Sequence, residues 1–128
     1  MKLLLDTQAF LWFALNDPQL SAAASAHIMD PLHEKFVSPA SFWEVAIKIS
    51  TGKYSLLQPY KDFFRQGIDD NGFEILPVEI AHTDIVTTLP FHHRDPFDRL
   101  IIAQAMAEGM VIISSDVQFD AYSIKRIW

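Results

Sequence analysis

Short apolar runs alternate with helix-like stretches along most of the chain. The strand-like runs lie at residues 2–5, 35–38, 73–78, 110–114 and 123–128. Strands that alternate with helices in this way are typical of α/β proteins, in which parallel strands form one sheet. The sequence therefore predicts an α/β fold with a mainly parallel central sheet.

Two of the helix-like stretches are apolar nearly all round. Residues 39–50 and 96–109 each begin with a proline at the first helical position, and the second ends at Gly109, as helices often do. Because they lack a broad polar face, both helices are expected to be covered on more than one side.

The sequence LLQPYKDFFRQGI at residues 56–68 predicts an amphipathic helix. The sequence DDNG at residues 69–72 is a good signal for its end. The apolar stripe of this helix is expected to contain Leu57, Tyr60, Phe63, Phe64 and Ile68.

Length and composition limit the possible folds. A chain of 128 residues, 50% of them hydrophobic, can form one domain with a real core, so we interpret residues 1–128 as a single domain. The absence of cysteine excludes disulfides and thiolate metal sites. Asp6 interrupts the apolar start, and no later apolar run approaches the roughly 18 residues of a membrane span. We therefore expect a soluble, cytoplasmic protein with no membrane partner.

The net charge of −6 argues against a broad electropositive surface for nucleic acid. It does not exclude an enzyme that acts on nucleic acid, because a bound divalent cation reverses the sign of an acidic site locally.

Two aspartates follow strand-like runs. Asp6 comes directly after residues 2–5, and Asp116 comes shortly after residues 110–114. In open parallel sheets the ligand crevice lies outside the carboxyl ends of the strands, so both positions are candidates for a site. Either residue could instead be an ordinary helix N-cap, which is the favoured interpretation for Asp6 taken alone. If the first and fourth strands are neighbours, the two acids would meet where the strand order reverses.

Glu44 belongs to a polar stripe on the predicted helix at residues 39–50. With Ser41 it could form a capping box, and with Lys48 it could form an ordinary i,i+4 ion pair. Nothing in its local sequence marks Glu44 as catalytic.

Asp95 and Asp98 stand at the start of the predicted helix at residues 96–109. Asp95 precedes Pro96 and is predicted to be the N-cap. Asp98 lies in the first turn, on the same stripe as Ile102 and Ala105, so its carboxylate is expected to point toward the packed side of the helix. A carboxylate in that position needs a partner.

Asp6, Glu44, Asp98 and Asp116 could share one crevice only with a cation. Two carboxylates about 4 Å apart repel each other by roughly 4 kcal/mol at an effective dielectric constant of 20. Mg²⁺ or Mn²⁺ would remove this cost, and both ions prefer hard oxygen ligands. Their remaining waters supply a nucleophile, and their open positions accept a phosphate oxygen.

The order of these motifs resembles a known family. LLLDT, SFWEVAIK, DRLIIAQA and IISSD span nearly the whole chain and are similar to motifs of PIN-domain ribonucleases, most closely the VapC-like toxins of type II toxin-antitoxin systems. No single motif is specific, but the four acids in this order form a strong joint signal. The resemblance implies a PIN-like domain with three layers, α/β/α.

The resemblance also implies roles for individual residues. Catalytic and metal-binding roles fall on Asp6, Glu44, Asp98 and Asp116. Gln8 stands where the family often has Asn, and Ser114 stands where many members have Thr, which keeps the hydroxyl. Supporting roles are expected for Asp95, Ser114, Thr7 and Gln8.

The implied activity is Mg²⁺- or Mn²⁺-dependent endonucleolytic cleavage of RNA by a metal-activated water, which leaves a 5′ phosphate. The implied partners are a second copy of the chain in a homodimer and a cognate antitoxin that wraps the toxin and places a basic side chain in the acidic pocket. Residues 9–15 are a candidate for part of an antitoxin or dimer groove, although plain core explains most of them at least as well.

Four basic residues flank the acidic helices and are candidates for contacts to the RNA backbone: Arg94, Arg99, Lys48 and Lys53. An ordinary salt bridge is the better explanation for any one of them. The histidines are interpreted as surface or hydrogen-bonded residues rather than metal ligands, although His93 could lie near the path of a phosphate.

Other functions remain open at this point. A haloacid-dehalogenase-like, Mg²⁺-dependent phosphatase also has an Asp after its first strand, but its second acid would have to stand at Gln8. A receiver-type domain would need another acid beside Asp6 and a Lys after a late strand. A non-catalytic interaction domain would use all four acids as caps and surface pairs, and it would not bind Mn²⁺.

Overall fold

In a computed structural model, which describes residues 1–128, all five strands form one parallel sheet. The order of the strands is β3-β2-β1-β4-β5, and each neighbouring pair is parallel. The bounds are β1 Lys2–Leu5, β2 Glu34–Val37, β3 Phe73–Ile75, β4 Val111–Ile113 and β5 Arg126–Ile127. The predicted parallel sheet is confirmed, with shorter third and fifth strands than expected.

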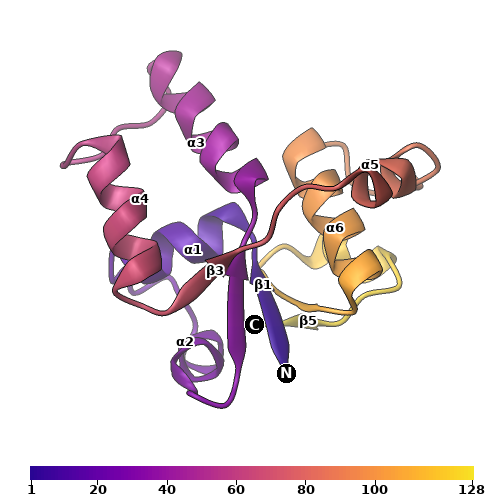
Figure 1. The fold of residues 1–128 in the computed structure, drawn as a ribbon, viewed down its shortest axis with the longest axis horizontal. Coiled ribbons are helices and arrows are strands. Elements are labelled where there is room, and N and C mark those ends of the chain that lie inside the picture. Colours follow the sequence, from indigo (N-terminus) through magenta and orange to yellow (C-terminus); the bar gives the residue numbers. More distant parts are fainter.

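Helices cover both faces of this sheet, which confirms the three-layer arrangement (Figure 1). The helices on one face are α1 (Thr7–Ala14), α2 (Ala22–Met29) and α4 (Tyr60–Asp69), and those on the other are α5 (Ile80–Val86) and α6 (Pro96–Glu108). Helix α3 (Pro39–Ser50) stands above the carboxyl ends of the strands, and a short 3₁₀ helix, η1, spans Val117–Ala121. None of the helices has the length and apolarity that a membrane span requires.

Strand β1 lies at the centre of the sheet and is buried on both faces. Leu3 and Leu5 pack with Phe10 on the side of α1, whereas Leu4 packs with Ile102 on the side of α6. Side chains alternate between the two faces along a strand, so a run of leucines serves both layers. Asp6, the next residue, therefore emerges at the middle of the carboxyl edge.

The starts of α3 and α6 agree with the sequence. Pro39 and Pro96 occupy the first turns, and Gly109 ends α6 with a φ of +64°. Helix α6 is covered on more than one side, as predicted, because it packs against both α3 and α5. Helix α3 differs from the prediction, since the side chain of Trp43 is 64% exposed.

Helix α4 begins later than its apolar pattern indicates. Leu57 precedes the helix and is fully exposed, so its predicted place in the apolar stripe is wrong. Pro59 is the N-cap, and a residue before a proline is disfavoured in the helical conformation. Phe63 and Phe64 are buried as predicted, and the chain turns after the helix at Gly72, whose φ is +70°.

Candidate active site

The four acids singled out in the sequence line one cavity of about 260 Å³ at the carboxyl edge of the sheet. Asp6 follows β1 and Asp116 follows β4, and these two strands are neighbours. Glu44 comes from α3, and Asp98 comes from the first turn of α6. The expected meeting of the two strand ends is therefore observed. Other polar residues lining the cavity are Thr7, Gln8, Lys48, Asp95 and Ser115.

Asp6 combines a structural role with a place in the cavity. Its Oδ1 accepts the backbone N–H of Ala9 at 2.8 Å and so caps α1. Its Oδ2 accepts a hydrogen bond from the hydroxyl of Ser114, which is fully buried. The two interpretations of Asp6, cap and site residue, are thus compatible.

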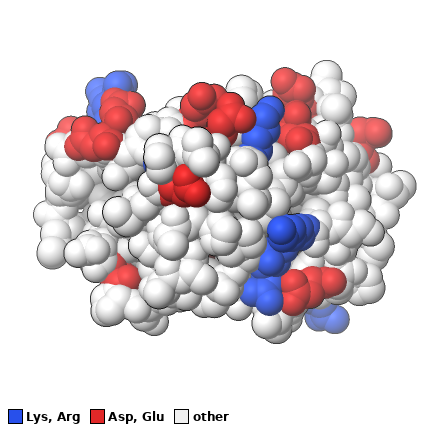
Figure 2. Space-filling model, turned by 90° about the horizontal axis from the view of Figure 1, so that it is seen from below, with Lys and Arg blue, Asp and Glu red and all other residues white.

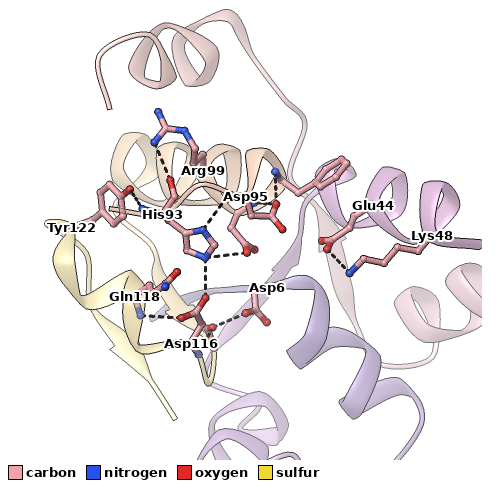
Figure 3. A network of polar contacts seen from close by, with 12 residues as sticks. Asp6, Glu44, Lys48, His93, Asp95, Arg99, Asp116, Gln118 and Tyr122 are labelled. Carbon is pink, nitrogen blue, oxygen red and sulfur yellow. Dashed lines mark hydrogen bonds and ion pairs between the residues drawn. The ribbon is translucent and has the colours of Figure 1, made fainter. Parts of the chain in front are cut away.

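Asp116 is also an N-cap that faces the cavity. Its Oδ1 accepts the N–H of Gln118 at 2.9 Å, and its own N–H donates to the hydroxyl oxygen of Ser114 at 3.0 Å. Because Ser114 also donates to Asp6, this one side chain connects both acids at the strand ends. Figure 3 shows Asp6 and Asp116 facing each other.

Glu44 is buried beneath the rim of the cavity, where Lys48 pairs with it at 2.9 Å (Figure 3). The hydrogen bond from Lys48 to Glu44 raises the pKa of the lysine. The ion pair agrees with the sequence, but the capping box between Ser41 and Glu44 is not formed. The N-cap of α3 is Ser38, and Ser41 accepts a hydrogen bond from Thr7 at 2.9 Å instead, which ties α3 to α1.

Asp95 caps α6 and so places Asp98. The Oδ1 of Asp95 accepts the N–H of Phe97 at 2.8 Å and that of Asp98 at 3.2 Å. The side chain of Asp98 is only 18% exposed, as its place on the packed stripe predicts.

Burial and mutual repulsion raise the pKa values of two of these carboxyls, those of Asp6 and Asp98. Burial, opposed by the hydrogen bond from Ser114, raises the pKa of Asp6 to about 6. Burial, together with the nearby charges of Asp95 and Asp6, raises the pKa of Asp98 to about 8. The charged forms of Asp6 and Asp98 are therefore disfavoured in the absence of a cation.

The donor set fits a hard divalent cation. The acids lining the cavity offer carboxylate oxygens, and no sulfur ligand lies among the lining residues. Lys48 is the only lysine or arginine among them, and it already pairs with Glu44. A bound Mg²⁺ or Mn²⁺ would offset the repulsion that raises the two pKa values.

Arg99 requires a correction, because its guanidinium is not available to RNA. The residue is 4% exposed, and its Nη1 donates to the carbonyl oxygens of Pro90 at 2.9 Å and His93 at 3.2 Å. Its Nη2 donates to the carbonyl oxygen of Leu89 at 3.0 Å. Arg99 therefore fixes the loop before α6. Arg94, in contrast, is exposed.

The charges on the face at the amino ends of the strands are scattered. Figure 2, which views the molecule from below Figure 1, shows acidic and basic groups interspersed among uncharged residues. This face carries no broad basic surface, in agreement with the expectation from the net charge.

His93 contacts two of the site acids, whereas the sequence analysis expected only that it could lie near the path of a phosphate. Its Nε2 lies 2.8 Å from Oδ2 of Asp116 and 3.2 Å from Oδ2 of Asp98 (Figure 3). The ligand atoms of these three residues lie within 4.8 Å of one another. Its position two residues before the N-cap Asp95 gave no signal for these contacts to Asp98 and Asp116.

Comparisons with known proteins come from the sequence and from the fold. The family model of the PIN domain matches residues 3–125. Comparison with curated proteins gives no match.

The fold is similar to three solved structures of low sequence identity. A chain of VapBC2 from Rickettsia felis, bound to a DNA fragment from its promoter, has a TM-score of 0.72 at 13% identity over 99% of this chain and 98% of that one. VapBC from Salmonella typhimurium, bound to DNA, has a TM-score of 0.69 at 15% identity, covering 99% and 97% of the two chains. FitAcB from Neisseria gonorrhoeae has a TM-score of 0.66 at 18% identity, covering 98% and 96%.

Proposed function

The chain belongs to the PIN domain family, and from this premise we propose that it is a Mg²⁺- or Mn²⁺-dependent endoribonuclease, the toxin of a type II toxin-antitoxin pair. One observation carries the proposal: Asp6, Glu44, Asp98 and Asp116, which come from four different parts of the chain, line a single cavity. Caps and surface pairs alone would not need to converge in this way.

In this proposal the four acids hold the divalent cation, and the chain's other residues orient them. When bound, the cation supplies a polarised water as nucleophile and neutralises charge on the scissile phosphate. Ser114 fixes the carboxylate of Asp6, and the cap formed by Asp95 sets the position of Asp98. Lys48 pairs with Glu44 at 2.9 Å and so holds its carboxylate in place.

Arg94 and Lys48 remain the proposed contacts to the RNA backbone. Arg94 is exposed, and it lies directly before the cap of α6. Lys48 lines the cavity beside Glu44, and its side chain is 51% exposed. Basic side chains in such places position a substrate through its phosphates without reading its sequence.

The proposed protein partner is a cognate antitoxin, since the solved relatives include VapBC complexes. Within residues 9–15, the side chains of Phe10 and Leu11 belong to the core, as the alternative interpretation predicted. Trp12 and Phe13 line a groove of about 810 Å³ beside α2, and we assign this groove to the antitoxin.

We also propose a homodimer in the cytoplasm. The exposed side chains of Trp43 and Ile47 on α3 support the dimer, because they form an apolar strip on the surface, with Phe97 packed against the ring of Trp43. Sedimentation of the purified protein gives its mass in solution. A mass of one chain at micromolar concentration would contradict the dimer.

Sequencing of RNA ends tests the proposed activity. The wild-type protein and the variant Asp98→Asn are expressed briefly in a bacterial host, and 5′-phosphate ends are mapped. We expect new ends at defined sites with the wild type and none with Asp98→Asn. Asp84→Asn is the matched control, since Asp84 is an exposed acid of α5 outside the cavity, and it should behave as wild type. Equal cleavage by Asp98→Asn would contradict the proposal.

A further inference from the structure

We propose that His93 is a positioning residue, whose N–H at Nε2 holds the carboxylate of Asp116 beside that of Asp98 in the arrangement that binds the divalent cation. This inference rests on the metal site of the proposed function. It adds to that function a residue outside the four acids.

The tautomer of His93 is set by its surroundings. The backbone N–H of Asp95 donates to Nδ1 at 3.2 Å, so this nitrogen acts as the acceptor. In a neutral imidazole the hydrogen then belongs to Nε2. Nε2 faces two carboxylate oxygens, that of Asp116 at 2.8 Å and that of Asp98 at 3.2 Å. His93 is therefore placed as a donor to Asp116, next to Asp98, and not as a ligand to the cation.

The ring also has little freedom to move. Its side chain is 8% exposed, and its plane packs against the ring of Phe119 with centroids 5.4 Å apart. The backbone N–H of His93 donates to the hydroxyl of Tyr122 at 2.8 Å, and its carbonyl oxygen accepts from Arg99 at 3.2 Å. Tyr122 in turn donates to the carbonyl oxygen of Pro90 at 2.6 Å. Buried Arg99 and Tyr122 thus fix the loop that carries His93.

A fixed donor matters here because the two acids come from different elements and repel each other. Asp98 is carried by α6, whereas Asp116 follows β4 and is partly exposed. One oxygen of Asp116 is held by the N–H of Gln118, but its Oδ2 is held by His93 alone among the hydrogen bonds of the chain. Without the imidazole, Oδ2 is free to turn away from Asp98.

The fold contains a matched control for this arrangement. His82 is 1% exposed, its Nδ1 accepts the N–H of Glu79 at 3.0 Å, and its Nε2 lies 3.0 Å from Oε1 of Glu108. The two histidines share burial, tautomer and a carboxylate partner, but neither His82 nor Glu108 lines the cavity. Replacing His82 therefore reproduces the loss of a buried histidine without affecting the site acids.

The test is calorimetric titration of Mn²⁺ into the metal-free wild type and the variants His93→Phe, His93→Gln and His82→Phe. Removing a residue that orients metal ligands typically weakens affinity by about 10- to 100-fold, and we expect His93→Phe to fall in this range. His93→Gln retains an N–H donor and should recover most of the affinity, whereas His82→Phe should bind as the wild type does. Wild-type affinity in His93→Phe would overturn the inference. So would equal losses in His93→Phe and His93→Gln, or in His93→Phe and His82→Phe.

Two measurements on the wild type do not depend on whether a variant folds. Nitrogen-15 NMR of the metal-free protein should show hydrogen on Nε2 of His93, and hydrogen on Nδ1 alone would overturn the inference. The electron spin echo of bound Mn²⁺ should show no directly coordinated nitrogen, and such a nitrogen would make His93 a ligand instead. If the wild type binds no Mn²⁺, the proposed function fails and the inference fails with it. If only the inference fails, the wild type still binds Mn²⁺ and Asp98→Asn still loses that binding.

Discussion

Ser114 donates its hydroxyl hydrogen to Oδ2 of Asp6, although the two residues are 108 positions apart in the sequence. Each residue follows one of two neighbouring strands, so the parallel pairing of β1 with β4 brings them together. The same hydroxyl oxygen accepts the N–H of Asp116 at 3.0 Å. The edge of the sheet and the acidic cavity are therefore built from the same hydrogen bonds.

Ser114→Ala is expected to lower the free energy of unfolding by about 1.5–3 kcal/mol, the range for a hydrogen bond to a charged group. The hydrogen bond from Ser114 lowers the pKa of Asp6, so its loss should raise that pKa further. Urea unfolding and an NMR titration of Asp6 measure the two effects. Ser115→Ala, at an exposed neighbouring position, should change stability by less than about 0.5 kcal/mol. An unchanged pKa of Asp6 in Ser114→Ala would contradict this assignment.

The metal-free protein should lose stability as the pH rises from about 4 to about 8. The pKa of Asp98 is raised to about 8 and that of Asp6 to about 6, against an ordinary value of 3.8 for each. Between these limits the folded state binds more protons than the unfolded state, so the free energy of unfolding falls with rising pH. Each pKa unit corresponds to about 1.4 kcal/mol. Thermal unfolding in a chelator at pH 5 and pH 8 checks the sign.

Asp98→Asn isolates the part of this pH dependence that belongs to one carboxyl. The variant should lose less stability between pH 5 and pH 8, and at pH 8 it should be more stable than the metal-free wild type. Added Mn²⁺ should stabilise the wild type at pH 8 and have much less effect on the variant. If both proteins had the same pH dependence, the burial of Asp98 could not be its cause.

Two substitutions at Asp95 separate its cap from its charge. Asp95→Ala should lower stability by about 0.5–2 kcal/mol, because two N–H groups at the start of α6 lose their acceptor. Asp95→Asn keeps the cap but removes a charge that raises the pKa of Asp98, so that pKa should fall. Unfolding and NMR titration measure these changes. Complete loss of RNA cleavage in a well-folded Asp95→Ala protein would give Asp95 a direct part in the chemistry.

Arg99 is predicted to stabilise the fold, whereas Arg94 is predicted to contact RNA. Arg99→Ala leaves the carbonyl oxygens of Leu89 and His93 without a donor, at about 1–3 kcal/mol each, and should destabilise the fold strongly. Arg94→Ala should change the free energy of unfolding by less than about 0.5 kcal/mol. It should lower the affinity for RNA and make that affinity less dependent on salt concentration. Unfolding and filter binding at several salt concentrations separate the two effects. Unchanged RNA binding by Arg94→Ala would remove it from the proposed RNA contacts.

The strand and helix pattern predicted the layers and the sheet edge where Asp6 and Asp116 meet, because burial on both faces of a parallel sheet imposes apolar runs. Leu57 was assigned wrongly because the apolar spacing of the helix continues across Pro59. A proline disfavours the helical conformation in the residue before it, so the helix begins only after Pro59. The apolar composition of α3 predicted that the helix is covered on more than one side, but the side chain of Trp43 is exposed in the single chain.

The long-range partners could not be predicted from local sequence. The sequence allowed a capping box between Ser41 and Glu44, but Thr7 of α1 is the partner of Ser41, and only the packing of the two helices decides between these bonds. The contacts of His93 to Asp98 and Asp116 could not be predicted for the same reason. Its ring points into the site because Arg99 and Tyr122 fix the path of the preceding loop.

The most direct test is cleavage of RNA by purified protein with added Mn²⁺ or with a chelator. The wild type should cleave a mapped target RNA only with the metal, Asp98→Asn should not cleave it under either condition, and Asp84→Asn should match the wild type. Cleavage by the wild type in the chelator, or metal-dependent cleavage by Asp98→Asn at the wild-type rate, would contradict the assignment of the four acids.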